Sequence, residues 1–287
     1  MPTRIYSITF VLLWASAFVS AKFGMTASGP FSFLFVRFAI VSVIFLGIAV
    51  VLKSVWPARQ LLMPTMLAGV LMHGVYLGGV FFAISKGTPA GIASLIVSIQ
   101  PIITAFLALI FLSENIRRVQ WLGIATGMAG VIMVIYPRLG GAIPLIGLIS
   151  CLVAVNAMSV GTIIQKRYLG QVDLVAGNTL QAVAAAGFYG LLLMTVETYY
   201  LEWTLEVTLS MIWIITTVSI GAITILMILI RSGQMAATSS LFFMVPPVSA
   251  LMGYFFFGET LGIIGMIGVA VASFGVWLVN KPAKEDA

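Results

Sequence analysis

The chain has 287 residues, of which 61% are hydrophobic and only 8% are charged, and its mean hydropathy is +1.17. Because a soluble protein cannot bury so much apolar surface, this composition predicts an integral membrane protein. The formal net charge of +6 then bears on topology and not on nucleic-acid binding, since the short loops leave no room for a soluble catalytic or nucleic-acid-binding module.

Apolar runs long enough to cross a membrane follow one another along the chain. They cover residues 4–22, 30–52, 62–85, 89–112 and 118–136, and then 143–165, 174–195, 209–230, 234–257 and 261–280. Runs of roughly 18 to 24 residues match a hydrocarbon core of ~30 Å, and their continuity favours helices over the alternating strands of a barrel. The sequence predicts an all-α integral membrane fold of ten transmembrane helices, with the first run counted as a span and not as a cleaved signal peptide.

The two halves of the chain repeat one another at a constant offset of 145 residues. Ser94, Pro101, Glu114, Gly123 and Gly130 recur as Ser239, Pro246, Glu259, Gly268 and Gly275. Apolar composition alone does not place a proline, a carboxylate and two glycines in register. We therefore expect two five-helix repeats, residues 1–138 and 139–287, an organisation typical of secondary transporters.

Charges differ between alternate loops. One side of the membrane would collect Arg4, Lys53, Arg59, Arg117, Arg118, Lys166, Arg167, Arg231, Lys281 and Lys284, and the other Lys22, Lys86, Arg138 and the acidic residues Glu197, Glu202 and Glu206. The positive-inside rule then places both termini in the cytoplasm. Because each half has an odd number of helices, the two repeats would be inserted in opposite orientations.

Several short motifs occur in a characteristic order. They are Leu13-Trp14-Ala15-Ser16-Ala17-Phe18, Arg37-Phe38, the stretch from Tyr76 to Leu95, Pro101 to Ser113-Glu114, and Pro246 to Gly258-Glu259-Thr260. Together they resemble the EamA-type transporters of the drug/metabolite transporter superfamily over nearly the whole chain. The resemblance implies ten helices around a central cavity, and export or exchange of small metabolites such as amino acids and their derivatives. Lys86 and Val245-Pro246-Pro247 depart from the family pattern and leave the substrate open.

Arg37 is the only cation well inside a predicted span. An arginine at that depth is costly unless it finds partners or a water-filled cavity, so it is either a substrate site or a tie between helix ends. His73 and Tyr76 lie three residues apart and are expected to share a helix face. His73 is a candidate for substrate contact or proton transfer, with a hydrogen-bonded packing role as the alternative.

Further candidates for substrate binding are uncharged. Ser98, Gln100, Asn156 and Gln181 are expected to be buried, where they would bind a polar solute or join neighbouring helices, and Trp14 would stack on the substrate or pack in the core. The matching prolines Pro101 and Pro246 predict a bend or hinge in each repeat.

Other residues have expected structural roles. Glu114 and Glu259 are predicted to anchor turns by accepting backbone hydrogen bonds at the start of the next helix. The glycines of the fifth and tenth runs are expected to form close-packing faces, within the bundle or in a homodimer. Cys151 is a core residue by default, and no intrachain disulfide is available to one cysteine.

The remaining expectations concern function. No acidic residue is predicted at mid-membrane depth, which favours a facilitator or exchanger over an ion-coupled carrier. The chain has one histidine and one cysteine, which is too few for a metal site, and no paired aspartates are predicted within the membrane. We therefore expect neither a cofactor nor an enzyme. A secondary transporter of small molecules in a bacterial inner membrane is predicted. A non-transporting scaffold and, less favoured, an intramembrane enzyme using His73 are the alternatives.

Overall fold

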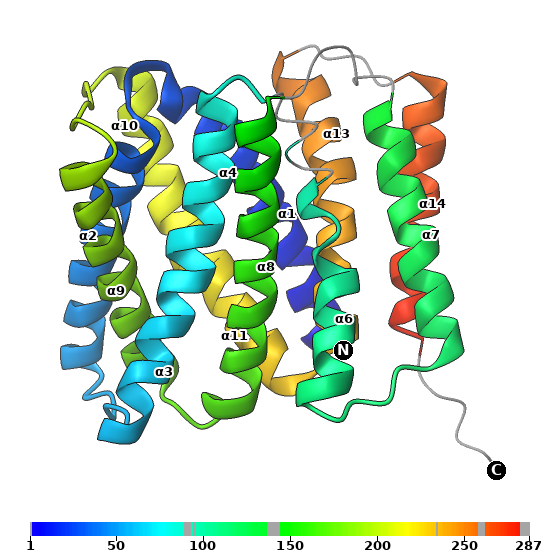
Figure 1. Cartoon of the computed structure of the whole chain (residues 1–287), viewed down its shortest axis with the longest axis horizontal. Helices are drawn as coiled ribbons and strands as arrows, with labels where there is room; N and C mark the ends of the chain where they lie inside the picture. Colours follow the sequence, from blue (N-terminus) through cyan, green and yellow to red (C-terminus); the bar gives the residue numbers. More distant parts are fainter. Residues whose placement is uncertain are drawn as a thin grey trace.

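The chain is a bundle of helices in the computed structural model, which describes residues 2–88, 93, 96–136, 144–233, 235–257 and 262–281 (Figure 1). The first half contains α1 (Pro2–Gly24), η1 (Met25–Ala27), α2 (Pro30–Val51), α3 (Arg59–Gly69), η2 (Val70–Val75), α4 (Tyr76–Ser85), α6 (Gln100–Phe111) and α7 (Arg118–Ile135). The second half contains α8 (Leu145–Tyr168), α9 (Leu174–Thr195), α10 (Leu205–Trp213), η4 (Ile214–Ala222), α11 (Ile223–Ser232), α12 (Met235–Ser240), η5 (Leu241–Met244), α13 (Val245–Phe257) and α14 (Ile263–Val279). Within the described residues the only strand-like pairing is an isolated bridge between Ser28 and Leu201, so the predicted all-helical class is confirmed.

Several helical stretches are long and apolar enough to cross a membrane, judged by length and composition. They are Ile5–Ala27, Pro30–Val51, Arg59–Ser85, Leu145–Tyr168 and Leu205–Ser232. Shorter apolar helices are Gln100–Phe111, Arg118–Val134 and Ile263–Val279. These stretches coincide with predicted apolar runs, because a chain in hydrocarbon must satisfy its backbone polar groups within helices.

Helix boundaries follow from local chemistry. α2 begins at Pro30, whose missing N–H costs nothing in the first turn of a helix. α9 begins after Asp173, whose side chain accepts hydrogen bonds from the backbone nitrogens of Val175 and Ala176. Such caps satisfy donors that have no partner inside the helix.

Two segments with a wider, π-helical turn interrupt long helices at matching places in the two halves. η2 separates α3 from α4, and η4 separates α10 from α11. Shifted by the repeat offset of 145 residues, η2 falls on residues 215–220, inside η4. Because π turns are rare and frequently mark functional sites, this recurrence directs attention to the space between them.

α7 and α14 form a close pair at one edge of the bundle (Figure 1). A Cβ atom built on Gly130 would lie 2.3 Å from the backbone nitrogen of Ala272, and one built on Gly275 would lie 2.3 Å from that of Gly127. Only residues without a side chain permit this approach. The expected close-packing faces are therefore confirmed, and they meet each other within one chain.

The η1 end of the bundle, at the top of Figure 1, is where η1, the start of α2 and the α9–α10 connection meet. The carboxylate of Glu197 accepts hydrogen bonds from the backbone nitrogen and the hydroxyl of Ser32, each 2.8 Å long. The backbone nitrogen of Gly29 donates to the carbonyl oxygen of Tyr200 at 2.8 Å. Glu197 thus caps α2 across the two halves, where a carboxylate also complements the helix dipole.

The α12 end, at the bottom of Figure 1, is where α3 and α12 begin. The carboxylate oxygens of Glu114 accept a hydrogen bond from the backbone nitrogen of Met235, at 2.9 and 3.2 Å. Lys166 Nζ donates to the carbonyl oxygen of Gly233 at 2.7 Å. Glu114 therefore anchors a helix start as expected, but the helix is α12 of the other half and not the next one in the chain, because α6 and α12 pack together. Glu259 lies outside the described residues.

Candidate functional site

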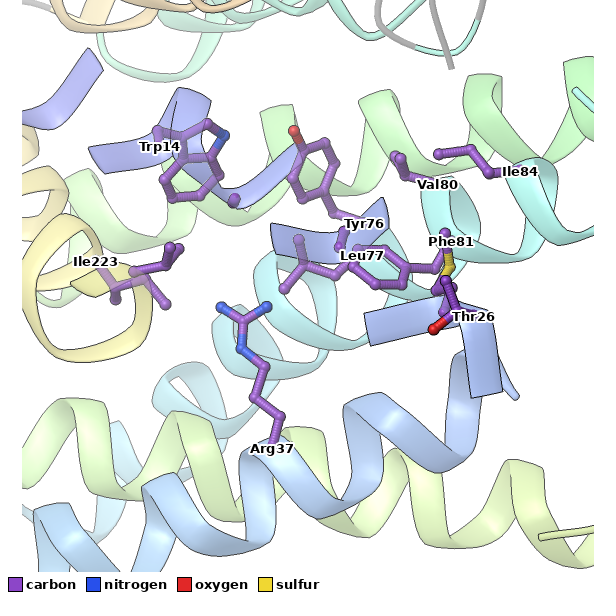
Figure 2. Close-up of a pocket in the computed structure, with 13 residues that line it drawn as sticks. Trp14, Thr26, Arg37, Tyr76, Leu77, Val80, Phe81, Ile84 and Ile223 are labelled. Carbon is purple, nitrogen blue, oxygen red and sulfur yellow. The ribbon is translucent and has the colours of Figure 1, made fainter. Parts of the chain in front are cut away.

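A cavity of about 370 Å³ lies in the middle of the bundle, among α1, η1, α2, α4, η4 and α11 (Figure 2). Most of its wall is apolar, with Leu77, Val80 and Phe81 among the lining side chains. The lining continues to Thr26 and Ile84, which lie near the η1 end. The cavity therefore extends from the centre of the bundle toward the η1 end.

Both halves of the chain contribute to this cavity, and they do so beside the π segments. Tyr76 is the first residue of α4, directly after η2, and Ile223 is the first residue of α11, directly after η4. Val218 lines the cavity from within η4 itself. The π segments of both halves thus border the cavity.

Arg37 is the one charged side chain among the described residues that line the cavity. It is 1% exposed, and its Nε donates to the hydroxyl of Ser219 in η4 at 3.0 Å. Its two terminal nitrogens point into the cavity (Figure 2). The aromatic ring of Phe38 lies 5.1 Å from its guanidinium carbon, a weak cation–π contact. No acidic side chain stands among the described lining residues, so this buried guanidinium has no carboxylate partner there.

An aromatic cluster of Phe10, Trp14 and Phe242 adjoins the cavity, which Trp14 lines, on the side toward the α12 end. The ring centroids of Trp14 lie 5.3 Å from those of Phe10 and 5.4 Å from those of Phe242. Trp14 also stacks with Tyr76 at 6.5 Å. A void of only about 10 Å³ lies beyond Trp14 and Tyr76, lined by Ser98 and other residues. We call Phe10, Trp14 and Phe242 the aromatic plug.

His73 and Gln181 lie behind the cavity wall in a buried polar chain. His73 Nε2 is 3.2 Å from Gln181 Oε1, and Gln181 Nε2 donates to Gln165 Oε1 at 2.7 Å. Because an amide oxygen only accepts, His73 donates from Nε2 in this arrangement. The expectation that His73 shares a face with Tyr76 is wrong. The i→i+5 bonding of η2 widens the turn, so that Tyr76 lines the cavity while His73 turns toward α9.

Tyr189 of α9 supports the same π turn. Its hydroxyl donates to the carbonyl oxygens of His73 and Gly74, at 2.7 and 2.8 Å. The ring of Phe38 stacks between His73, at 5.6 Å, and Tyr189, at 6.0 Å. These contacts fix the ring of Phe38, which is the neighbour of Arg37 in α2, and so help to position Arg37.

The other expected residues are dispersed. Gln100 is buried and its amide nitrogen donates to Thr104 at 3.3 Å, away from the cavity lining. Asn156 was expected to be buried, and this is wrong: its side chain is exposed and donates to the carbonyl oxygen of Leu152. α8 is apolar on more than one face, so the sequence pattern did not fix which side Asn156 presents.

The two prolines occupy equivalent places. Pro101 lies in the first turn of α6, after turn residues 98–99, and Pro246 lies in the first turn of α13, after the tighter helix η5. In a first turn the missing N–H of proline leaves no intrahelical bond unmade. Both prolines therefore follow a break in regular α-helix. Ser94 lies outside the described residues.

The first half of the chain matches a known protein family. Residues 2–136 match the EamA-like transporter family. This part of the chain is an EamA transporter domain. The match spans the elements α1 to α7, which supply Trp14, Arg37 and Tyr76 to the cavity.

Relatives that align over most of this chain are named as transporters. The chain is 28% identical over 272 residues to the uncharacterized inner membrane transporter YedA of Escherichia coli K12, covering 94% of this chain and 87% of the relative. It is 24% identical over 282 residues to the uncharacterized transporter YvbV of Bacillus subtilis, covering 96% and 90%. It is 26% identical over 226 residues to a probable amino-acid metabolite efflux pump of Escherichia coli K12, covering 78% and 72%. These relatives and the long apolar helices of the chain indicate a multi-pass membrane protein.

A crystal structure with the same fold is among the solved structures that match. This crystal structure, titled only as that of a protein, superposes with a TM-score of 0.81 and covers 97% of this chain and 96% of its own, at 17% sequence identity. At that identity the likeness concerns the fold alone.

Sequence reasoning missed the part of the site that lies outside the EamA domain. Ser219, the partner of Arg37, and the lining residues Val218 and Ile223 come from η4 and the start of α11. A serine in an apolar run gives no sign of its partner, and a π turn has no sequence signature comparable to a proline. Within the described residues, no group of three or more His, Cys, Asp or Glu that could hold a metal ion is present.

Proposed function

We propose that this protein is a secondary transporter that exports or exchanges small metabolites by alternating access of two inverted five-helix repeats, residues 1–138 and 139–287. The observation that carries the proposal is the central cavity, which both halves line beside their matching π segments and which contains a buried arginine without a carboxylate partner among the described lining residues. Sites between repeats, near breaks in helices, are typical of secondary transporters.

The repeat is supported by three independent features. Residues recur at an offset of 145, the π segments recur at the same offset, and cations collect in alternate loops. With five helices in each half, the loop charges favour opposite insertion of the repeats and both termini in the cytoplasm. In this arrangement the η1 end faces outward, and the relatives named as inner membrane transporters support a bacterial inner membrane.

Alternating access has a physical basis in the way the two ends are held. The cavity extends toward the η1 end, while the aromatic plug and the bonds of Glu114 and Lys166 hold the α12 end together. To release a substrate on the other side, these contacts must separate and the η1 end must close. Pro101 and Pro246 follow breaks in regular helix and are the proposed hinges.

The energetics favour exchange or facilitated movement. Glu114, Glu197 and the other described acidic residues lie at helix ends or in connections, and the described cavity lining contains none. A carrier that binds H⁺ or Na⁺ commonly uses a carboxylate at mid-membrane depth. Without one, substrate binding itself must supply the free energy that shifts the two conformations.

The enzyme reading lacks its parts in the described structure. His73 binds Gln181, and no serine or cysteine donates to it there. A nucleophile and its base must lie within hydrogen-bond reach. The scaffold reading is separated from transport by flux alone.

The test is counterflow in liposomes that contain the purified protein and no ion gradient. The vesicles are preloaded with an unlabelled pool of amino acids and acylated amino acids and offered the labelled compounds one at a time. Saturable accumulation in wild type, lost in Trp14→Ala and kept in the exposed-surface variant Arg59→Met, is the expected result. No accumulation of any compound, with or without an imposed pH gradient, would favour the scaffold.

A further inference from the structure

We propose that the ligand of the cavity is an organic carboxylate that carries one negative charge on an apolar body and has no free ammonium group. This inference rests on the proposed function, because it names the class of substrate for the same site. It is carried by the position of Arg37 and by what surrounds it.

The first step concerns the charge of Arg37. Its guanidinium is almost completely buried, and its one described hydrogen bond is from Nε to Ser219. The two terminal nitrogens face the cavity without a carboxylate partner among the described residues (Figure 2). A buried charge without a counter-ion is unfavourable. A ligand carboxylate can accept both N–H groups in a parallel, bidentate pair, the strongest arrangement available to arginine.

The second step concerns the number of charges on the ligand. Arg37 is the only cation among the described lining residues. One carboxylate neutralises it, whereas the second charge of a phosphate monoester would remain unpaired in an apolar space. The site therefore matches a singly charged anion.

The third step excludes a free ammonium group. In an amino acid the ammonium is attached one carbon away from the carboxylate, so it would lie within a few ångströms of the guanidinium that binds that carboxylate. Like charges at such a separation repel strongly where water is excluded. The described lining provides no acidic side chain to offset this repulsion, and the hydroxyls of Thr26 and Tyr76 carry no charge that could do so.

The fourth step concerns the body of the ligand. The lining is mostly apolar and includes Leu77, Val80 and Phe81, and the rings of Trp14 and Tyr76 stack with each other in it. A volume of about 370 Å³ accommodates a small aryl or alkyl group. Acylated or deaminated derivatives of apolar amino acids combine this body with a single carboxylate.

The experiment compares four ligands that share a phenyl ring. They are 3-phenylpropanoate, N-acetyl-phenylalanine, phenylalanine and phenethylamine. Binding to purified protein in detergent is measured by equilibrium dialysis of labelled 3-phenylpropanoate, with the others as competitors, in a buffer that contains neither chloride nor another carboxylate. We expect the two monoanions to bind at least about tenfold more tightly than phenylalanine or phenethylamine. Equal binding of phenylalanine would overturn the proposal.

Variants test whether Arg37 is responsible. Arg37→Met is expected to lower the affinity for 3-phenylpropanoate by at least about tenfold, and Arg37→Lys by less, because lysine keeps the charge and loses the bidentate geometry. Arg59→Met removes an exposed cation and is the charge-matched control, expected to bind as wild type. The unfolding temperature of Arg37→Met is measured in parallel to show that the variant is folded, because it loses the hydrogen bond to Ser219 together with the buried charge. Wild-type affinity in Arg37→Met would overturn the proposal.

Two further outcomes are distinguishable. If chloride protects the protein from thermal unfolding while no organic carboxylate binds saturably, the site takes an inorganic anion only and the proposal is wrong. If the monoanions bind as expected but liposomes show no counterflow, the ligand class stands and the proposed transport function fails.

Discussion

The packing of α7 against α14 can be tested by adding one methyl group. In Gly130→Ala the new Cβ would lie 2.3 Å from the backbone nitrogen of Ala272 and 2.7 Å from the carbonyl oxygen of Gly268. Backbone atoms cannot turn aside as a flexible side chain can. The two helices must therefore separate by roughly 1 Å to restore ordinary van der Waals contact.

The magnitude follows from this separation. Overpacking a close contact costs about 1–3 kcal/mol, and a gap of roughly 0.5–1 Å forfeits about a quarter to a half of the dispersion energy of the neighbouring contacts. For a chain of this size, such a loss lowers the unfolding temperature by roughly 2–10 °C. The matched control is Gly187→Ala in α9, where a Cβ would meet no atom within 4 Å. This control is expected to stay within about 1 kcal/mol of wild type and to be neutral or stabilising.

The assay uses Cys151, the single cysteine of the chain, which is buried. A dye that fluoresces on reaction with a thiol reports unfolding when the protein is heated in detergent, because only then does Cys151 become accessible. Gly130→Ala should react at a lower temperature than wild type and Gly187→Ala should not. Equal unfolding temperatures for all three proteins would refute the close packing of these helices.

Three further changes give separate expectations. Ser219→Ala removes the hydrogen bond to Arg37, worth about 1.5–3 kcal/mol for a charged donor, and should weaken carboxylate binding roughly tenfold in equilibrium dialysis; an unchanged affinity would mean that Ser219 does not orient the guanidinium. Asn156→Leu should leave counterflow at the wild-type rate, since the side chain is exposed and bonded within its own helix; lost flux in a folded variant would return Asn156 to the site. Glu197→Ala removes both hydrogen bonds from Ser32 and should lower the unfolding temperature, at a cost of about 1–2 kcal/mol for a lost cap; a wild-type melting curve would contradict the interlock of the two halves.

The sequence predicted the parts of the molecule that depend on composition and spacing. Apolar runs located the helices, because hydrocarbon demands continuous apolar length. Gly130 and Gly275, in register between the repeats, predicted close packing. Arg37 stood out as a deep cation, and the structure places it in the cavity with Trp14 and Tyr76, three residues proposed from the sequence.

The rest depended on three-dimensional relations that a periodic pattern does not contain. The separation of His73 from Tyr76 arises from the π turn of η2, whereas the sequence argument assumed a regular α-helix. Asn156 faces outward. The sequence did not predict this, because the residues around Asn156 are apolar on more than one face of the helix. Ser219 joins the site through a contact between distant segments, which no local motif encodes.

Two-sided accessibility of the cavity tests alternating access most directly. The measurement uses Leu77→Cys, a half-buried position in the cavity wall, in a protein whose buried Cys151 is replaced by alanine. Protein of one orientation in sealed vesicles is treated with a membrane-impermeant maleimide from either side. Two variants are controls. Thr26→Cys, near the η1 end, is expected to react from that side only. Asn156→Cys is expected to react from neither side, because its position is on the outer surface of the apolar helix α8, where lipid would cover it. The account predicts that Leu77→Cys reacts when the maleimide is added on either side of the membrane. Reaction only when it is added on the η1 side would contradict the account.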